Sequence, residues 1–202
     1  MKVLLIASTP KELKAIKEWI KKANLKMNLN IDYLCCGIWN YEVVSSLEHY
    51  LTQNSAPVFI WNIWVCDYWN SESEEKSEPI QVSSIINIHT EKEVIIPPFL
   101  QIASLKNCFS GENIILENFR FQNGIWIWYN EIYFDMESWW VEFVASKYKY
   151  PRLILRLPFY YIWMKTESSK IEKSLNDLEF SLKNLPYHEY LWKILDWINK
   201  TA

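Results

Sequence analysis

The chain has 202 residues, of which 50% are apolar and 22% charged, a composition typical of a folded globular domain and not of a disordered chain. Its 21 Lys and Arg residues stand against 24 Asp and Glu, a formal net charge of -3. This balance argues against nucleic acid or an anionic membrane as a partner, because either would require a basic face. No apolar run reaches the roughly 18 residues of a membrane span.

The first half of the sequence predicts alternating strands and helices. Residues 3–8 are almost continuously apolar, as in a strand buried on both faces. Pro10 then opens a helix, at a position where its missing N–H costs nothing. Further strands are predicted at 31–36 and 57–63, with a helix at 41–51 that Asn40 caps. This β-α-β-α-β order predicts a largely parallel sheet that helices cover on both faces.

The second half begins with a polar stretch, residues 71–78, which predicts a solvated loop. After it, the pattern predicts a meander of strands at 80–88, 93–96 and 113–117, a helix at 137–149, a strand at 151–157, and helices at 169–183 and 187–200. There is no internal repeat and no low-complexity segment. We therefore expect one α/β domain over residues 1–202.

Cysteine and histidine usage predicts no metal site, and nothing else in the sequence implies an organic cofactor. The four cysteines show no C-x-x-C spacing and the three histidines are scattered: Cys35, Cys36, Cys66, Cys108, His49, His89 and His188. Buried thiols of a cytoplasmic protein explain the cysteines. The short apolar N-terminal stretch is predicted to be a buried strand and not a signal peptide, since a charged helix follows at once.

The sequence has 12 Trp and only 3 Gly, although about 14 Gly would be usual at this length. Many of the tryptophans fall at predicted strand ends and turns, where the backbone favours glycine: Trp39, Trp61, Trp64, Trp69, Trp126, Trp128 and Trp163. Our hypothesis is that most of these positions are UGA codons that the host reads as glycine. UGG codons at Trp39, Trp61 and Trp64 would refute it in favour of a genuinely Trp-rich protein.

With glycine at those positions, most of the chain resembles the nucleoside phosphorylase and nucleosidase superfamily, nearest to 5′-methylthioadenosine/S-adenosylhomocysteine nucleosidase or futalosine hydrolase. The segments that carry the match are Thr9-Pro10-Lys11-Glu12, Cys36-Gly37-Ile38-Trp39-Asn40, Asn62-Ile63-Trp64-Val65-Cys66-Asp67, Asp135-Met136-Glu137-Ser138 and Arg156. The resemblance implies a three-layer phosphorylase/hydrolase-like domain with a central mixed, largely parallel sheet covered by helices. It also implies a purine-nucleoside substrate, a place in nucleoside metabolism such as methionine salvage, and a homodimer.

The resemblance also implies roles for individual residues. Glu137 would accept hydrogen bonds from the ribose hydroxyls and stabilise an oxocarbenium-like ribose. Met136 would pack against the sugar, and Glu12 would position or activate the attacking water. The remaining expected substrate-binding residues lie on the base side: Val65, Asp67, Ile114 and Tyr160. No set of basic residues suits a phosphate ion, which favours a hydrolase over a phosphorylase.

Each acid also has a structural explanation, because Glu12 and Glu137 both suit the first turn of a helix. For Arg156 we favour the role of a solvated or paired structural cation. The sequence departs from the family on the base side. Tyr160 falls at the position of the catalytic Asp, Asp67 replaces a glycine, and Ile114 replaces a stacking aromatic residue.

Three functions follow from these observations. The first is a nucleosidase with an altered base site. The second is a catalytically impaired homologue that binds a nucleoside or a protein partner. The third is a Trp-rich flavodoxin-like binding module, which is disfavoured because no glycine-containing phosphate loop follows the first strand.

Overall fold

The structure is a computed structural model, and it describes residues 2–27, 29–37, 39–54, 58–70, 78–111, 131–161 and 182–201. Its N-terminal half consists of β1 (Lys2–Ala7), α1 (Pro10–Asn24), β2 (Ile31–Cys35), α2 (Asn40–Gln53) and β3 (Val58–Asn70). β1 pairs in parallel with both β2 and β3. The predicted β-α-β-α-β order is therefore confirmed, although β3 runs seven residues beyond its predicted end.

The C-terminal half contains β4 (Ile80–Asn87), β5 (Glu93–Ile95), β6 (Ser104–Ser110), β7 (Glu131–Asp135), α4 (Ser138–Lys147), β8 (Arg152–Tyr161) and α6 (Tyr187–Thr201). The predicted strands at 80–88 and 93–96 are confirmed as β4 and β5, which pair antiparallel as in a meander. The chain does not continue as a meander, because the next strand, β6, pairs in parallel with β4. β6 and β7 were not predicted. The predicted strand at 113–117, almost all of the polar stretch at 71–78 and most of the helix at 169–183 lie outside the described residues.

The eight strands form one mixed sheet in which five strands close a ring, β3-β7-β6-β4-β8. β3 is the central strand of this arrangement. β1 and β8 both pair with β3 around Ile60–Asn62, so they lie on opposite flanks of it. β7 and β8 both pair with β3 at Asp67 and Tyr68, so β7 lies on the same flank as β1.

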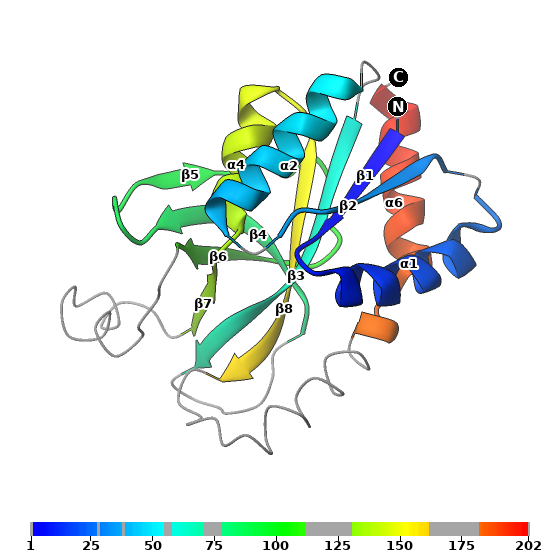
Figure 1. Cartoon of the computed structure of the whole chain (residues 1–202). Helices are drawn as coiled ribbons and strands as arrows, with labels where there is room; N and C mark the ends of the chain where they lie inside the picture. Colours follow the sequence, from blue (N-terminus) through cyan, green and yellow to red (C-terminus); the bar gives the residue numbers. More distant parts are fainter. Residues whose placement is uncertain are drawn as a thin grey trace.

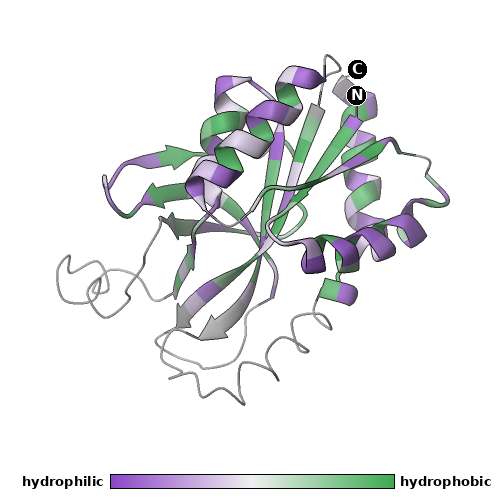
Figure 2. Cartoon of the chain, viewed as in Figure 1, coloured by the Kyte–Doolittle hydropathy of each residue, from purple (hydrophilic) through white to green (hydrophobic). Residues whose placement is uncertain are grey.

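Helices cover both faces of the N-terminal part of the sheet, α1 and α6 on one face and α2 and α4 on the other (Figure 1). Each helix pair lies over its own hydrophobic cluster. One cluster joins Ile16 of α1 and Ile194 of α6 to the sheet, and the other joins Leu47 of α2 and Val144 of α4 to it. Figure 2 shows the apolar strands between helices whose outer faces are polar. The predicted three-layer α/β architecture with a mixed sheet is confirmed.

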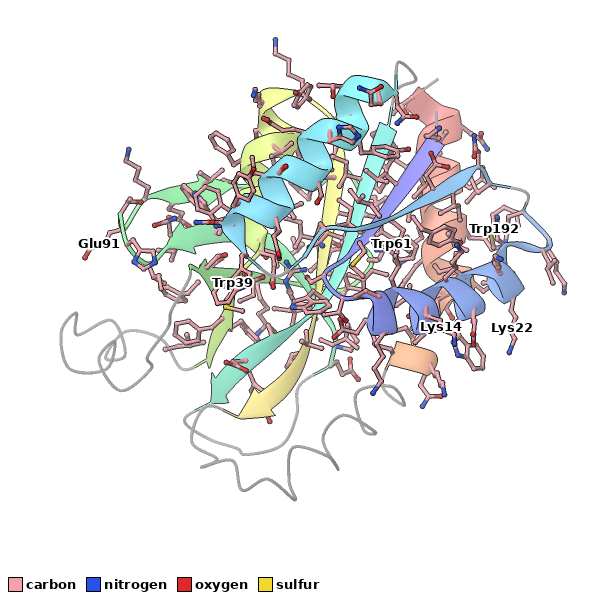
Figure 3. All side chains as sticks on the ribbon, in the orientation of Figure 1. Lys14, Lys22, Trp39, Trp61, Glu91 and Trp192 are labelled. Carbon is pink, nitrogen blue, oxygen red and sulfur yellow. The ribbon has the colours of Figure 1, made fainter. Side chains whose placement is uncertain are left out.

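The tryptophans do not share one environment. Trp61 is fully buried in the first cluster, where its ring contacts Tyr187 and Tyr190 edge-on, and Figure 3 shows it among the packed side chains of the sheet. The sequence groups Trp61 with positions at strand ends and turns that favour glycine, but the structure places its side chain in the core. Trp39 is 46% exposed, and its φ of -94° is an ordinary extended value. Positive φ thus gives no reason for glycine at Trp39, and the codon hypothesis stays a prediction.

The residue that immediately precedes α2 is Trp39 and not Asn40, which the sequence predicts as the cap. Asn40, the predicted cap, is the first helical residue, and its Oδ1 accepts from the Tyr41 N–H at 2.5 Å. The four cysteines are free thiols, three of them buried. None of the helices within the described ranges has the length and hydropathy of a membrane-spanning segment.

Candidate active site

Two strand ends meet on one flank of β3, and each leads into a loop that carries a predicted catalytic acid. β1 pairs with β3 over Val58–Asn62 and ends at Ala7. β7 runs in the opposite direction, pairs with β3 over Asp67–Asn70 and ends at Asp135. Residues 63–66 of β3 lie between these two ends. Because Glu12 and Glu137 follow the two ends, the topology brings them to one place.

Glu12 lies in the first turn of α1, in a capping arrangement with Thr9. The Thr9 hydroxyl donates to the Glu12 carboxylate, and the Glu12 backbone N–H points to the Thr9 Oγ at 3.5 Å. The Thr9 backbone N–H also contributes to the Glu12 carboxylate, which is the reciprocal contact that a Thr-x-x-Glu spacing allows at a helix N-terminus. Burial nevertheless raises the pKa of Glu12 to about 7, against the lowering effect of these hydrogen bonds. Such a pKa suits a group that takes up a proton near neutral pH.

Glu137 is fully buried at the start of α4. Among the described residues, no donor makes a hydrogen bond of normal geometry to either of its carboxylate oxygens. Burial raises the pKa of Glu137 to about 8, and the negative charge of Asp135 adds to the rise, whereas Arg156 and the Met136 N–H oppose it. The charge of Glu12 also contributes, which shows that the two acids are electrostatic neighbours. Two unpaired acceptors at such a depth are costly unless a bound molecule supplies donors.

Arg156 is fully buried on β8 and is held by polar groups from three other segments. Its Nε donates to Asp135, Nη1 donates to Asn62 Oδ1 at 2.6 Å, and Nη2 donates to Ser138 Oγ at 2.7 Å. Asp135 also accepts from the Ser138 N–H at 3.0 Å. The network fixes the turn that leads from β7 into α4. Arg156 is therefore a paired cation, as favoured from the sequence, and it supports the segment that carries Glu137.

The end of β2 closes the site from another side, at Cys36 and Gly37. The Gly37 N–H donates to the Ser8 carbonyl at 3.1 Å, so this segment runs along the end of β1. Gly37 has φ +82°, and a Cβ there would come within 2.3 Å of the Glu42 side chain, so glycine is required. The Cys36 thiol lies close enough to Glu137 that this carboxylate helps burial to raise the pKa of Cys36 to about 12. The Cys36 thiol therefore stays protonated and borders the site, and it is not a nucleophile.

The predicted base-side residues are only partly described. Val65 lies on β3 between the two strand ends and packs against the first hydrophobic cluster, and Asp67 follows two residues later. Met136 is half-buried beside Glu137. Tyr160 pairs in register with Asp67, but its side chain is outside the described part of the chain, as is all of Ile114.

The sequence does not identify three supporting residues of the site. Asp135 and Asn62 lie within the family-like motifs, and both hold Arg156. Ser8 is buried at the end of β1 with its hydroxyl unpartnered among the described residues, next to the loop that carries Glu12. The signal for Asp135 was its spacing of three residues from Ser138, an Asp-x-x-Ser pattern at a helix start. No group of His, Cys, Asp and Glu within the described ranges is arranged to hold a metal ion.

Comparison with known proteins defines the class of fold. No protein-family profile matches the chain, and no curated protein matches its sequence. Its structure is similar to that of a 5′-methylthioadenosine/S-adenosylhomocysteine nucleosidase from Borrelia burgdorferi bound to adenine, with a TM-score of 0.68 and 13% identity over 92% of this chain and 98% of that one.

Two further structures show the same similarity. The corresponding nucleosidase of Campylobacter jejuni has a TM-score of 0.67 and 15% identity over 99% of both chains. That of Chlamydia trachomatis bound to MTA has a TM-score of 0.65 and 15% identity over 96% of this chain and 99% of that one. The chain therefore has the fold of the MTA/SAH nucleosidases, and the predicted resemblance is confirmed at the level of the fold.

Proposed function

We propose that this protein is a nucleosidase that hydrolyses the N-glycosidic bond of a purine-type nucleoside of the 5′-methylthioadenosine, S-adenosylhomocysteine or futalosine class. One observation carries the proposal. Glu137 is a fully buried acid with two unpaired oxygens among the described residues, and its pKa responds to the charge of a second, half-buried acid, Glu12. A pair of adjacent ribose hydroxyls supplies the two donors that these oxygens lack.

The proposed mechanism divides the work between the two acids. Donation by the ribose hydroxyls favours the charged form of Glu137 and so lowers its pKa when the nucleoside binds. As the bond from C1′ to the base breaks, positive charge develops on the ribose, and the Glu137 carboxylate stabilises that charge through the hydroxyls. Glu12, with its pKa of about 7, takes a proton from the water that attacks C1′. The adenine and MTA bound to structures of the same fold support a nucleoside ligand for this site.

Release of the free base is the direct test. The purified protein is incubated with 5′-methylthioadenosine, S-adenosylhomocysteine, inosine and futalosine, and the bases are separated by chromatography. We expect release from at least one of them and its loss in Glu137→Gln. If a folded protein releases no base from any of the four, the alternative function gains support, namely a catalytically impaired homologue that binds a nucleoside or a protein partner.

We also propose that the protein forms a homodimer. Large apolar side chains are exposed at the start of α2 and on the neighbouring helix α4, where Trp39, Tyr41 and Phe143 are 46%, 78% and 50% exposed. Burial of such side chains between two copies would stabilise a dimer. Sedimentation velocity of the wild type and of Phe143→Glu tests this, because the variant is expected to shift the population toward the monomer.

A further inference from the structure

Asp67 lies on β3, which pairs with both β1 and β7, the strands that lead to Glu12 and Glu137. On one flank its register partner is Phe134 of β7, one residue before the turn that leads to Glu137. On the other flank its register partner is Tyr160 of β8. The register between β3 and β8 slips by one residue between Cys66 and Asp67, so that Phe159 of β8 has no partner. Such a bulge locally bends a strand and redirects its side chains, and bulges are frequent beside active sites.

The Asp67 carboxyl resembles that of Glu137, and differs from those of Asp135 and Glu12, in having no hydrogen-bond donor of normal geometry among the described residues. Asp135 is held by Arg156 and Ser138, and Glu12 is held by Thr9. Among the described residues, no side chain or backbone group donates a hydrogen bond to Asp67. Burial raises the pKa of Asp67 to about 6, and the nearby charge of Asp135 adds to the rise. A half-buried carboxyl of this kind can hold a proton and release it near neutral pH.

The chemistry of the proposed reaction requires one such group. When the bond between C1′ and the base nitrogen breaks, its electron pair stays on the base, and an unprotonated purine leaves as a poor anionic leaving group. Glu12 and Glu137 serve the water and the ribose in the proposed mechanism, so neither acts on the base. Asp67 of β3 pairs in register with Tyr160 of β8. Asp67 is the stronger acid of the two, because the ordinary pKa of a Tyr phenol is about 10.

We propose that Asp67 is the general acid that donates a proton to a ring nitrogen of the departing base. This proposal rests on the proposed nucleosidase function. The bond from C1′ to the base breaks, the base gains the Asp67 proton, and the oxygen of water bonds to C1′. The water gives one of its two protons to Glu12 and keeps the other in the new hydroxyl group on C1′. Transfer of that proton back to Asp67 through solvent restores both acids.

A pair of substrates with the same sugar and different leaving groups isolates the step. 5′-Methylthioadenosine needs protonation of its base, whereas the 4-nitrophenyl riboside with the same 5′ substituent releases nitrophenolate, which is stable without a proton. Asp67→Asn is expected to lower kcat/KM for adenine release by about 100-fold or more, the usual contribution of a general acid. It is expected to change hydrolysis of the nitrophenyl riboside by less than about 3-fold. Glu137→Gln is expected to lose both, and the exposed Asp196→Asn neither.

The outcomes separate the two proposals. If Asp67→Asn slows both substrates equally or slows neither, Asp67 is not the acid, while base release by the wild type still supports the nucleosidase. If Tyr160→Phe loses adenine release selectively and Asp67→Asn does not, the phenol is the acid. If the wild type cleaves neither substrate, both proposals fail. Retained nitrophenyl hydrolysis shows that Asp67→Asn is folded, and Asp67→Ser, with the same expected split, replaces it if it is not.

Discussion

Replacement of Glu137 by glutamine is expected to stabilise the folded chain at neutral pH while removing the proposed activity. Folding raises the pKa of Glu137 from 4.5 to about 8, chiefly through burial. As the pH rises through this window the unfolded chain releases the proton first, so the stability that the buried group supports at low pH is lost. Glutamine has the same shape and carries no charge at any pH.

The size of the effect follows from the shift. One pKa unit corresponds to about 1.4 kcal/mol, so the carboxyl destabilises the wild type by roughly 3 kcal/mol at pH 7 relative to the glutamine variant. At pH 5 the difference falls below about 1 kcal/mol, because the folded carboxyl is then protonated and the pH lies only about half a unit above the pKa of the unfolded carboxyl. Burial also raises the pKa values of Glu12 and Asp67, and this contribution cancels in the comparison, whereas the repulsion between Glu12 and Glu137 acts in the wild type alone.

Urea unfolding of the wild type and Glu137→Gln at pH 5, 6, 7 and 8 measures this difference. The expected result is a gap in unfolding free energy that widens with pH up to about pH 8 and then stays constant. A gap that is the same at every pH, or that has the opposite sign at pH 7, would refute the argument that Glu137 is buried without a compensating partner in the unliganded protein.

Two further predictions concern the interior. Arg156→Met leaves Asp135 buried without its cation and is expected to lower the unfolding free energy by about 3–5 kcal/mol. As a control, Lys200→Met breaks an exposed pair with Asp196 and is expected to lower the unfolding free energy by less than about 1 kcal/mol. Equal losses of the two variants in urea unfolding would contradict the pairing described for Arg156. Trp61→Gly removes a fully buried indole and is expected to cost about 3–5 kcal/mol or more, while Trp39→Gly, at a half-exposed position, is expected to cost far less. If Trp61→Gly instead raises the midpoint of thermal unfolding, the packing described around Trp61 is wrong and glycine at that position in the native protein becomes the better explanation.

The local patterns of the N-terminal half are strong enough to be interpreted without tertiary information. The apolar run of β1, the stripe of Ile16 and Ile20 on α1, and the Thr9-x-x-Glu12 spacing each depend on neighbours within a few residues. Their predicted elements agree with the structure. β6 and β7 are different, since each is short and pairs with a strand far away in the sequence, and nothing local distinguishes them from loops.

The motifs also predicted Glu12 and Glu137 as candidate catalytic residues, but the sequence could not show that the two lie close together. That depends on β1 and β7 ending from opposite directions on one flank of β3. It likewise left Arg156 as either solvated or paired, because its partner Asp135 is 21 residues away on another strand.

By itself, then, the sequence determined the α/β class, the order of the first five elements and the chemical types of the candidate catalytic groups, since these follow from short-range periodicity and residue chemistry. The tertiary structure decided which of those groups are buried, which lie close to another charged group, and which have no hydrogen-bond donor among the described residues. The unpaired oxygens of Glu137, the Arg156 network and the register of Asp67 with Tyr160 all arise where distant strands converge on β3, and convergence of that kind leaves no trace in any local segment.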